Sequence, residues 1–363
     1  MNLLEEQRRE INEIDMEMAK LFERRMKACE SVANYKMSHA LPVLDVAREA
    51  EVIALGAERV KDSVLREYYV SFLKDVMKTS RAYQTRLLQG MRVTYSGVEG
   101  AFGHLATRKA FQNAQFEASS GFAEAYAAVE NGIYDCAVLP IENSYAGDVS
   151  TVMDLMFSGS LYVNRIIELD VSHNLLAKKN VAIDKIRTVV SHPQALEQCA
   201  EFIQQYGWKT ISYSNTALAA KYIAEQEDDS LAAIASLETA EIFSLDVLAK
   251  GIHSAKNNTT RFAVFSRVQH LPAENDREGH KHFMLMFTTK NEAGALVQPL
   301  NILGAHNFNM RTVRSRPMKQ PAWSYYFFVE AEGNINTENG RNMLCELSAV
   351  CNRLKLVGAY ELE

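Results

Sequence analysis

The feature of this sequence that most constrains its fold is a change of periodicity near residue 90. From residue 3 to residue 88 the apolar residues recur with helical spacing, and Gly56 is the only glycine in that stretch. Pro42 lies between the first and second helical runs, at a place where proline can begin a helix. We therefore predict an all-helical domain over residues 1–90.

Short apolar segments take over after residue 92 and alternate with helical stretches as far as residue 265. Examples of the expected strands are Cys136–Leu139, Thr188–Val190 and Ala232–Ala235. Alternation of strands and helices is typical of an α/β domain, which we place at residues 91–268. A polar stretch from His270 to His280 follows and is interpreted as a linker.

The last part of the chain, residues 280–363, shows a third pattern. The expected elements are a strand at Phe283–Thr289, a helix at Glu292–Leu303, strands at Asn309–Arg316 and Tyr325–Glu330, a helix at Glu338–Leu354 and a strand at Leu356–Leu362. The order βαββαβ predicts a small α+β sandwich of the ferredoxin-like type.

Charge and cysteine usage exclude several classes of protein. The N-terminal MNLLEEQRRE is charged, and no apolar run is long enough to cross a bilayer. A net charge of −6 argues against non-specific binding of nucleic acid. The cysteines are scattered and include no CxxC pair, which favours a reduced, cytoplasmic protein without disulfides or zinc; they are Cys29, Cys136, Cys199, Cys345 and Cys351.

Two cations share one stripe of the first predicted helix. At 100° per residue, Arg25, Cys29, Val32 and Lys36 point within about 40° of one another, whereas Arg8 points roughly 100° away. Any single charge of this kind usually lies in a surface ion pair. Burying both cations without an anion is costly, and a dicarboxylate ligand would remove that cost through charge-assisted hydrogen bonds.

The next two helices carry further polar residues at helical spacing. Asp45, Arg48 and Glu49 stand at i, i+3 and i+4 on the second helix, and Ser80 and Gln84 interrupt an apolar stripe on the third. Together with the first helix, this pattern resembles the all-helical chorismate mutase family over roughly 85 residues.

The resemblance implies a homodimer of intertwined chains, in which the long first helix crosses to the partner. It also implies two residues that donate to the ether oxygen of chorismate, Lys36 and Gln84, and six that bind or orient the rest of the substrate: Arg8, Arg25, Asp45, Arg48, Glu49 and Ser80. Arg8 would be contributed by the partner chain. Rearrangement of chorismate to prephenate is pericyclic, so cations and one amide suffice, without a metal or cofactor.

Several strands of the α/β segment end in small polar residues that open a helix. Ser191 precedes Pro193, Asn215 precedes Thr216, and Ser236 precedes Leu237. In α/β folds, ligands bind beyond the carboxyl ends of strands and at helix N-termini. Each of these residues could equally be an ordinary cap.

Four motifs in this segment appear in a fixed order. They are Pro140-Ile141-Glu142-Asn143-Ser144, Ser191-His192-Pro193-Gln194 followed by Gln198-Cys199, Asn215-Thr216-Ala217, and Asn258-Thr259-Thr260-Arg261-Phe262. Over about 175 residues they resemble the prephenate dehydratase family, whose two α/β lobes form a clamp around the site. Asn215 departs from that family, which usually has serine at this position.

This second resemblance implies loss of water and CO₂ from prephenate to give phenylpyruvate. Thr260 is the expected donor to the departing hydroxyl and acts through its neighbours, because an alcohol is a weak acid. Arg261 would supply charge near a carboxylate, and the remaining expected cleft residues are Glu142, Asn143, Ser191, Gln198, Thr216 and Phe262. Glu142 could instead be structural, because a bare carboxylate beside a dianion is unfavourable. No role is assigned to His104, His173 or His192.

The C-terminal sandwich resembles the ACT regulatory domain, which binds phenylalanine between two copies. The residues expected to bind this effector lie at the first helix and on the following strand: Gly294, Ala295, Leu296, Val297, Asn309, Ser315 and Arg316. The family's Glu-Ser-Arg-Pro reads Arg314-Ser315-Arg316-Pro317 here, which leaves the details of feedback inhibition open. A sandwich that only dimerises is the alternative.

Two other functions fit the sequence less well. A fusion to prephenate dehydrogenase needs a dinucleotide loop, and Gly97-x-x-Gly100-x-x-Gly103 lacks the required spacing. A non-catalytic sensor should have lost its charged pocket residues, yet both sets are intact. We predict a bifunctional enzyme of phenylalanine biosynthesis, active as a homodimer or a dimer of dimers.

Overall fold

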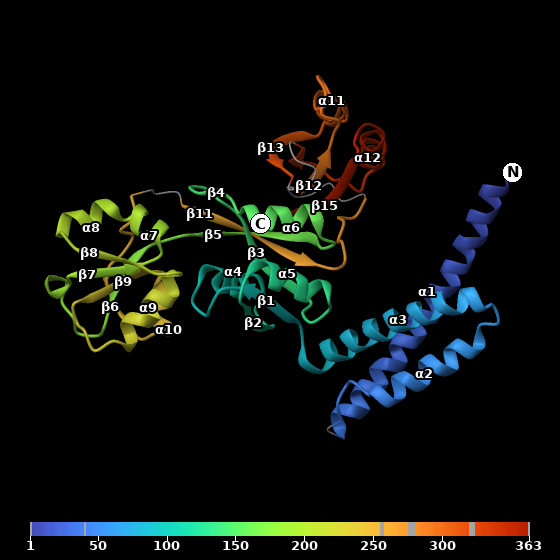
Figure 1. Cartoon of the computed structure of the whole chain (residues 1–363), viewed down its shortest axis with the longest axis horizontal. Helices are drawn as coiled ribbons and strands as arrows, with labels where there is room; N and C mark the ends of the chain where they lie inside the picture. Colours follow the sequence, from blue (N-terminus) through green and yellow to red (C-terminus); the bar gives the residue numbers. More distant parts are fainter. Residues whose placement is uncertain (1, 40, 255–257, 275–280, 319–323, 362–363) are drawn as a thin grey trace. The chain divides into compact units, whose positions relative to one another are not determined.

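A computed structural model of the chain describes residues 2–39, 41–254, 258–274, 281–318 and 324–361. The expected linker therefore lies partly outside the described residues. The chain forms two compact units, residues 1–92 with 113–115, and residues 93–112 with 116–363 (Figure 1). Among the described residues, no helix is both long and apolar enough to span a membrane.

The first unit consists of three helices, each with a capping side chain at its start. They are α1 (Leu3–Ser38), α2 (Val46–Arg59) and α3 (Ser63–Gln89). Asp45 caps α2 by accepting from the backbone N–H of Arg48, so it lies before the helix rather than on its face as expected. A Cβ at Gly56 would lie 2.3 Å from Cδ1 of Leu73, so the one glycine inside these three helices stands where α2 and α3 approach closely.

The second unit begins with the sheet that carries one lobe of the α/β domain. Its strands are β1 (Arg92–Ser96), β2 (Gln115–Ser119), β3 (Cys136–Asn143), β4 (Gly147–Asp148), β5 (Tyr162–Asp170) and β11 (Thr259–Ser266). Its helices are α4 (Phe102–Ala110), α5 (Phe122–Glu130) and α6 (Ser150–Ser158). Strands β1 and β3 are parallel, and β11 runs antiparallel to both of its neighbours, β3 and β5.

A separate five-stranded sheet, in the order β10-β6-β9-β7-β8, forms the other lobe. Its elements are β6 (Asn174–Ala177), a 3₁₀ turn (Ile183–Lys185), β7 (Thr188–Ser191), α7 (Pro193–Gln198), α8 (Ala200–Tyr206), β8 (Lys209–Ser212), α9 (Thr216–Glu225), β9 (Leu231–Ala235), α10 (Leu237–Ile242) and β10 (Asp246–Ala249). The expected helix starts are confirmed, with Pro193 in the first turn of α7 and Asn215 and Ser236 capping α9 and α10. The chain passes between the lobes twice, from β5 to β6 and from β10 to β11.

The C-terminal segment has the expected order βαββαβ. Its elements are β12 (Lys281–Thr288), α11 (Val297–Ala305), β13 (Asn309–Pro317), β14 (Tyr325–Glu332), α12 (Glu338–Val350) and β15 (Arg353–Glu361). The strands are ordered β13-β14-β12-β15, and β15 also pairs with β5 through Gly358 and Val163. The C-terminal strands and the first lobe therefore share one ten-stranded sheet.

Two helix boundaries in this segment were expected at the wrong residues. The helix α11 begins at Val297 rather than Glu292, because Gly294 has a left-handed φ of +81° and residues 292–296 form turns. The helix α12 ends at Val350 rather than Leu354, because Arg353 already pairs with Thr288 on β12. Strand pairing here overrides the local preference for helix.

One hydrophobic core joins the first lobe to the C-terminal strands. Met156 and Phe157 on α6 pack in the same cluster as Tyr326 on β14 and Val357 on β15. The rings of Phe157 and Tyr326 stack with centroids 4.4 Å apart. The C-terminal segment is thus packed against the lobe as well as paired with its sheet.

Candidate active sites

The helical unit contains a cavity of about 160 Å³. It is lined from all three helices and the connection before α2, by Arg25, Cys29, Val32, Lys36, Val43, Asp45, Arg48, Glu49, Val52, Met77, Ser80, Arg81 and Gln84. Seven of the eight residues expected here from the sequence are in this lining. The polar positions of separate helices therefore converge on one place.

The two cations of the α1 stripe are held by uncharged groups. Arg25 donates to the hydroxyl of Ser80, and Nζ of Lys36 donates to the backbone carbonyl of Val43 at 2.5 Å. Neither of these bonds neutralises a positive charge. Both cations can therefore add charge-assisted hydrogen bonds to an anionic ligand.

Gln84 is buried, with its amide at the same cavity. Its Nε2 donates to the backbone oxygen of Ser80 at 3.3 Å, and its Oε1 has no hydrogen-bond partner among the described residues. An amide nitrogen carries two protons, so one remains for a ligand oxygen. The unpaired oxygen is costly to leave buried and can accept from a ligand hydroxyl.

The two charged residues expected on α2, Glu49 and Arg48, form ion pairs with different partners. Glu49 forms an ion pair with Arg81 on α3, which ties the two helices together at the cavity. Arg48 instead pairs with Glu51 at 2.5 Å, and both of these side chains are well exposed. Arg81 was not among the expected site residues, although it stands next to Ser80 in the sequence.

Arg8 does not belong to this cavity. It is exposed on α1, 17 residues before Arg25, which corresponds to about 26 Å along a helix. Its side chain therefore cannot reach the cavity of its own chain.

The second unit contains a larger cavity, of about 380 Å³, to which both lobes contribute. Its lining includes three phenylalanines, Phe102, Phe122 and Phe262, and polar side chains that come mainly from strand ends and helix starts: Ser96, Asn143, Asp148, His173, His192, Gln194, Gln198, Ser214, Asn215, Thr216, Asn258 and Thr260. Five expected residues, Asn143, Gln198, Thr216, Thr260 and Phe262, are therefore brought together.

Three expected residues do not line this cavity: Glu142, Ser191 and Arg261. The hydroxyl of Ser191 is fully buried and donates to the backbone oxygen of Ile234 at 2.6 Å. Side chains alternate between the two faces of a strand, so Arg261 points away from the face that Thr260 and Phe262 share, and Glu142 points away from that of Asn143.

Asn143 fixes the orientation of the polar groups around Thr260. Its Oδ1 accepts from the backbone N–H groups of Tyr145 (3.0 Å) and Ala146 (2.9 Å), so its nitrogen must face the other way. That Nδ2 donates to Oγ1 of Thr260 at 2.9 Å and to Oδ1 of Asn258 at 2.8 Å. The hydroxyl proton of Thr260 is therefore available to a ligand.

The chain of amides continues into the second lobe and sets the tautomer of a histidine. Nδ2 of Asn258 donates to Oε1 of Gln198 at 2.9 Å, and Nε2 of His173 lies 2.8 Å from the same oxygen. Because Oε1 can only accept, His173 is protonated at Nε2. Burial lowers the pKa of His173 to about 4, so the ring is neutral at ordinary pH.

Asn258 and His173 were not among the expected site residues. Asn258 stands two positions before Thr260, and residues two apart on an extended segment share a face, which was the available signal. No neighbouring residue in the sequence marks His173 as a site residue in preference to His104. Its Nδ1 is buried without a hydrogen-bond partner among the described residues.

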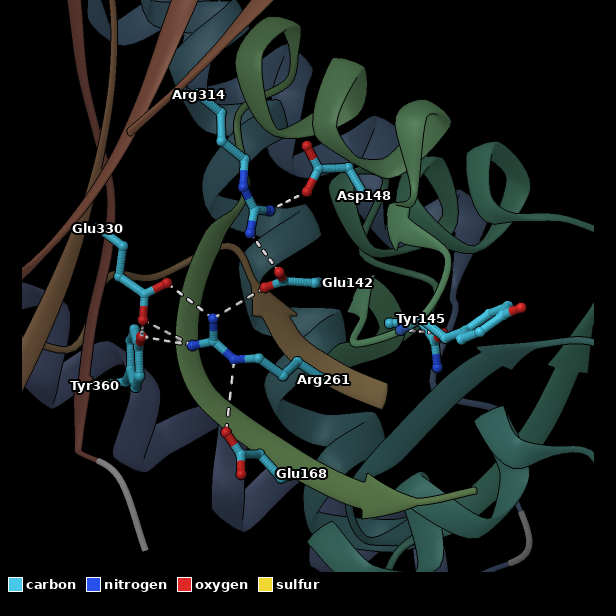
Figure 2. Close-up of polar contacts among 9 residues, drawn as sticks. Glu142, Tyr145, Asp148, Glu168, Arg261, Arg314, Glu330 and Tyr360 are labelled. Atoms are coloured by element: carbon cyan, nitrogen blue, oxygen red, sulfur yellow. Dashed lines mark hydrogen bonds and ion pairs between the residues drawn. The ribbon is translucent and has the colours of Figure 1, made fainter. Parts of the chain in front are cut away.

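Arg261 enters a polar cluster on the other side of the strand (Figure 2). It binds Glu330 of β14 through both terminal nitrogens, at 2.8 and 2.7 Å, and also contacts Glu142 at 3.3 Å and the hydroxyl of Tyr360 at 2.9 Å. Burial pushes the pKa of Glu330 upward, but the hydrogen bonds and charge of Arg261 outweigh it and hold that pKa below its usual value.

Arg314, the first residue of the Arg-Ser-Arg-Pro motif on β13, reaches the same cluster. It forms ion pairs with Glu142 and with Asp148, which itself lines the cavity (Figure 2). The expected effector residues lie in the turn before α11, at its first residue, and along β13. One of them, Arg316, already donates to the hydroxyls of Tyr326 and Ser150.

No group of three or more His, Cys, Asp or Glu side chains in the described parts of the chain is placed to hold a metal ion. The helical cavity offers guanidinium, ammonium, amide and hydroxyl groups, and the two-lobed cavity offers amides, hydroxyls and imidazoles. Such sites define a class of enzyme that holds and polarises its substrate through hydrogen bonds.

Comparison with known proteins assigns the two main parts of the chain to families. Residues 7–85 match the family model described as chorismate mutase type II, and residues 93–270 match the one described as prephenate dehydratase. A bifunctional chorismate mutase/prephenate dehydratase of Enterobacter agglomerans is 31% identical over 381 residues, which cover 98% of this chain and 95% of that protein. The chain belongs to the family of bifunctional chorismate mutase/prephenate dehydratases.

Solved structures resemble the second unit. A prephenate dehydratase from Arthrobacter aurescens in complex with L-Phe has a TM-score of 0.69 and 25% identity, and the match covers 75% of this chain and 90% of that one. A protein described as a novel type of quorum quenching acylase has a TM-score of 0.68 and 28% identity, covering 75% of this chain and 98% of that one.

Proposed function

We propose that this chain rearranges chorismate to prephenate in its helical unit and then dehydrates and decarboxylates prephenate to phenylpyruvate in its two-lobed domain. The observation that carries the proposal is the environment of Thr260. Its oxygen accepts a hydrogen bond from an amide of fixed orientation, at a cavity that also has an apolar wall. This arrangement suits a donor to a leaving hydroxyl.

In the mutase reaction, the helical cavity has to hold a compact conformer and stabilise charge on the breaking C–O bond. Arg25 would bind a carboxylate, because its hydrogen bond to the uncharged hydroxyl of Ser80 leaves its positive charge available. Lys36 and the second proton of Gln84 would donate to the ether oxygen as negative charge grows on it. The ion pair of Glu49 with Arg81 would keep α2 and α3 in place.

In the dehydratase reaction, the Thr260 hydroxyl would donate its proton toward the departing hydroxide. The amide of Asn143 stabilises the negative charge that this donation leaves on Oγ1. The ring is then expected to lie against Phe102, Phe122 and Phe262 while it becomes aromatic. Elimination of hydroxide with loss of CO₂ requires no oxidant and no added cofactor.

The carboxylates of prephenate would be bound without Arg261. Polar groups at the start of α9, including Asn215 and Thr216, face the cavity together with Gln194 and Gln198. Backbone N–H groups at a helix start favour an anion. We assign Arg261 and Glu142 to a structural cluster instead.

We further propose that the chain has three functional domains, at residues 1–90, 91–268 and 280–363. The last would be an ACT-type ferredoxin-like domain that binds phenylalanine as a feedback effector. Its βαββαβ order supports this proposal, as does the L-Phe bound to the Arthrobacter prephenate dehydratase. Arg314 is committed to ion pairs, so an amino-acid ligand would be recognised at the turn near Gly294 and along β13.

We also propose that the active species is a cytoplasmic homodimer built on α1. Ala33 is the only buried residue among the 36 of this helix, and apolar side chains remain exposed along its length; they include Leu4, Ile11, Ile14, Met18, Leu21 and Phe22. A helix with this much exposed apolar surface needs a partner. A second copy could also deliver Arg8 to the cavity that its own chain cannot reach.

The test is a pair of single-site variants of the full chain, assayed with chorismate and with prephenate. Lys36→Met should abolish formation of prephenate and leave conversion of prephenate to phenylpyruvate unchanged. Lys27→Met is the matched control, because nine residues separate it from Lys36 and turn it to the opposite side of α1. A wild-type protein that produces no phenylpyruvate from either substrate would refute the proposal.

A further inference from the structure

A partly buried polar cluster lies on the face of β11 opposite the dehydratase cavity. It is called the Arg261 cluster here and consists of Glu142, Asp148, Arg261, Arg314, Glu330 and Tyr360 (Figure 2). Half of its members, Glu142, Asp148 and Arg261, come from the first lobe. The other half come from three C-terminal strands, with Arg314 on β13, Glu330 on β14 and Tyr360 on β15.

The cluster and the cavity share two strand segments. Thr260 pairs with Asn143 across β11 and β3, and the next residues along, Arg261 and Glu142, pair with each other. Each strand thus presents one residue to the cavity and its neighbour to the cluster. A displacement of the β11 backbone at Arg261 is therefore passed directly to Thr260, the residue before it.

The contacts to the C-terminal strands are the strong ones in this cluster. Glu330 has only 4% of its side chain exposed and binds Arg261 through two parallel hydrogen bonds. The hydroxyl of Tyr360 donates to Glu330 and accepts from Arg261. The guanidinium of Arg261 is partly buried and is also contacted by Glu142 and Glu168, but its shortest contacts go to Glu330. Strands β14 and β15 therefore contribute most to its position.

A second set of contacts in the cluster, the ion pairs of Arg314, connects the cluster to the cavity. Glu142 bridges Arg261 and Arg314, and Arg314 continues to Asp148, which lines the cavity. Without Arg314, two carboxylates would stand close together beside the site of a dianion. The guanidinium of Arg314 therefore lowers the negative potential at the mouth of the site.

We propose that Arg261 and Arg314 are positioning residues of the dehydratase site, and that they make its geometry and charge depend on where the C-terminal strands lie. From the opposite face of the sheet, Arg261 fixes the strand segments that carry Thr260 and Asn143. The positive charge of Arg314 neutralises the carboxylate of Asp148. This inference rests on the proposed dehydratase activity. It assigns a function to the arginine that replaces the family's glutamate, since that arginine joins the C-terminal segment to the rim of the cavity.

The contacts of Arg261 (the first branch) and the ion pairs of Arg314 (the second branch) predict different kinetic effects. Removing a cluster contact of Arg261 misplaces the proton donor, so it should lower kcat with little change in KM. Removing the charge of Arg314 leaves the donor in place and repels the dianion, so it should raise KM with little change in kcat. A variant that was merely destabilised would also lower the apparent kcat, through loss of folded enzyme, so kcat is normalised to the folded fraction measured by thermal unfolding.

The first branch is tested with Tyr360→Phe, which removes only the hydroxyl and keeps the ring against His282. We expect kcat for prephenate to fall about tenfold and mutase turnover to be unchanged. Tyr326→Phe is the matched control, because Tyr326 is also buried on a C-terminal strand but bonds to Arg316 and Asp154, outside the cluster. Its kcat should stay close to that of the wild type.

The second branch is tested with Arg314→Ala, for which we expect KM for prephenate to rise about tenfold. Arg314→Lys restores the charge and should recover most of that loss. Arg311→Ala is the control on the same strand, because Arg311 pairs with Glu332 at an exposed position. Higher salt should narrow the difference between Arg314→Ala and the wild type, as expected for an electrostatic effect.

The outcomes separate this inference from the function on which it rests. A wild-type chain that does not convert prephenate would refute the proposed dehydratase activity itself. An active wild type with Tyr360→Phe and Arg314→Ala indistinguishable from their controls would overturn only the inference. Equal losses in mutase and dehydratase turnover would also overturn it, because they would indicate general instability.

Discussion

Asn143 donates a hydrogen bond from Nδ2 to Oγ1 of Thr260, at 2.9 Å, across the pairing of β3 with β11. Because the oxygen of the same amide is held by two backbone N–H groups, the amide cannot flip. The hydroxyl oxygen of Thr260 thus accepts a hydrogen bond from Asn143, and its proton can be donated to a ligand. A weak acid in this setting is a better donor than it is in water.

Removing the hydroxyl of Thr260 should stop dehydration. We expect Thr260→Ala to lower kcat for prephenate by about 10²–10³-fold and to leave mutase activity intact. Thr260→Ser, which keeps the hydroxyl, should retain much of the activity. Thr259→Ala is the adjacent control, because the side chain of Thr259 bonds to Asp170 and does not line the cavity. A Thr260→Ala enzyme with wild-type turnover would remove this residue from the mechanism.

The amide of Asn143 should matter through its nitrogen. Asn143→Asp keeps the oxygen that accepts from Tyr145 and Ala146 but loses the donor to Thr260 and adds a charge beside a dianion. We expect kcat to fall by about 10²-fold and KM to rise. Steady-state kinetics with prephenate at several pH values measure both effects. Activity should recover in part when the pH is low enough to protonate the new carboxyl.

If Arg8 acts in the partner's mutase site, inactive subunits should complement one another. Arg8→Ala and Arg25→Ala should each be inactive as mutase alone. In a mixed dimer, one site receives both arginines and the other receives neither, so random assortment should restore about one quarter of the wild-type activity. Co-expression of the two variants with different affinity tags tests this. Activity no greater than the sum of the parents would place Arg8 outside the site.

His173 should make the stability of the second unit depend on pH. Burial lowers its pKa from 6.5 in the unfolded chain to about 4 in the folded one. As the pH falls below 6.5, the unfolded state takes up a proton that the folded state refuses, so stability decreases until the pH approaches 4. The loss should amount to about 3 kcal/mol at most.

The measurement for His173 is urea unfolding at pH 7 and pH 5. His173→Gln keeps a donor for Gln198 but does not ionise, so its stability should fall less between the two pH values than that of the wild type. His306→Gln is the control with the opposite sign, because its hydrogen bond with Asn339 raises the pKa of His306. An identical pH response in His173→Gln and the wild type would contradict the assignment.

Gly358 should be intolerant of any side chain. A Cβ at this position would lie 1.9 Å from the carbonyl oxygen of Val163, where β15 pairs with β5. Gly358→Ala should therefore destabilise the second unit by about 2 kcal/mol or more and loosen the C-terminal strands. Gly304→Ala is the contrasting variant, since no atom lies within 4 Å of its added Cβ inside α11, and it should be neutral or stabilising. Calorimetry of the two variants would compare them directly.

Local signals account for much of what could be predicted. Helical spacing with a single glycine dictated three long helices, and capping residues such as Asn215 and Ser236 marked helix starts correctly. The elements that were misplaced, α11 and α12, are those whose ends depend on a turn at Gly294 and on pairing between β12 and β15. Such pairings join residues far apart in the sequence, so no local pattern reports them.

The site residues, too, could be predicted where a local motif carries them and not where pairing between distant strands places them. Side chains that stand in short motifs, such as Asn143, Gln198 and Thr260, were identified because each motif places its own residues in a fixed relation. The sequence predicted that Arg261 serves the substrate and left a structural role open only for Glu142, yet neither side chain lines the cavity. Glu330, the partner of Arg261, lies 69 residues away from it and only the sheet brings them together.

By itself, then, the amino-acid sequence determined the helical and α/β segments, the helix caps and the chemical types of residue that handle a small dianion, because these follow from spacing and propensity along the chain. The tertiary structure alone decided that Thr260 is oriented by Asn143, that His173 ends a chain of amides, and that Arg314 closes an ion pair with the rim of the cavity. Those relations arise from strand register and burial, which depend on the whole fold.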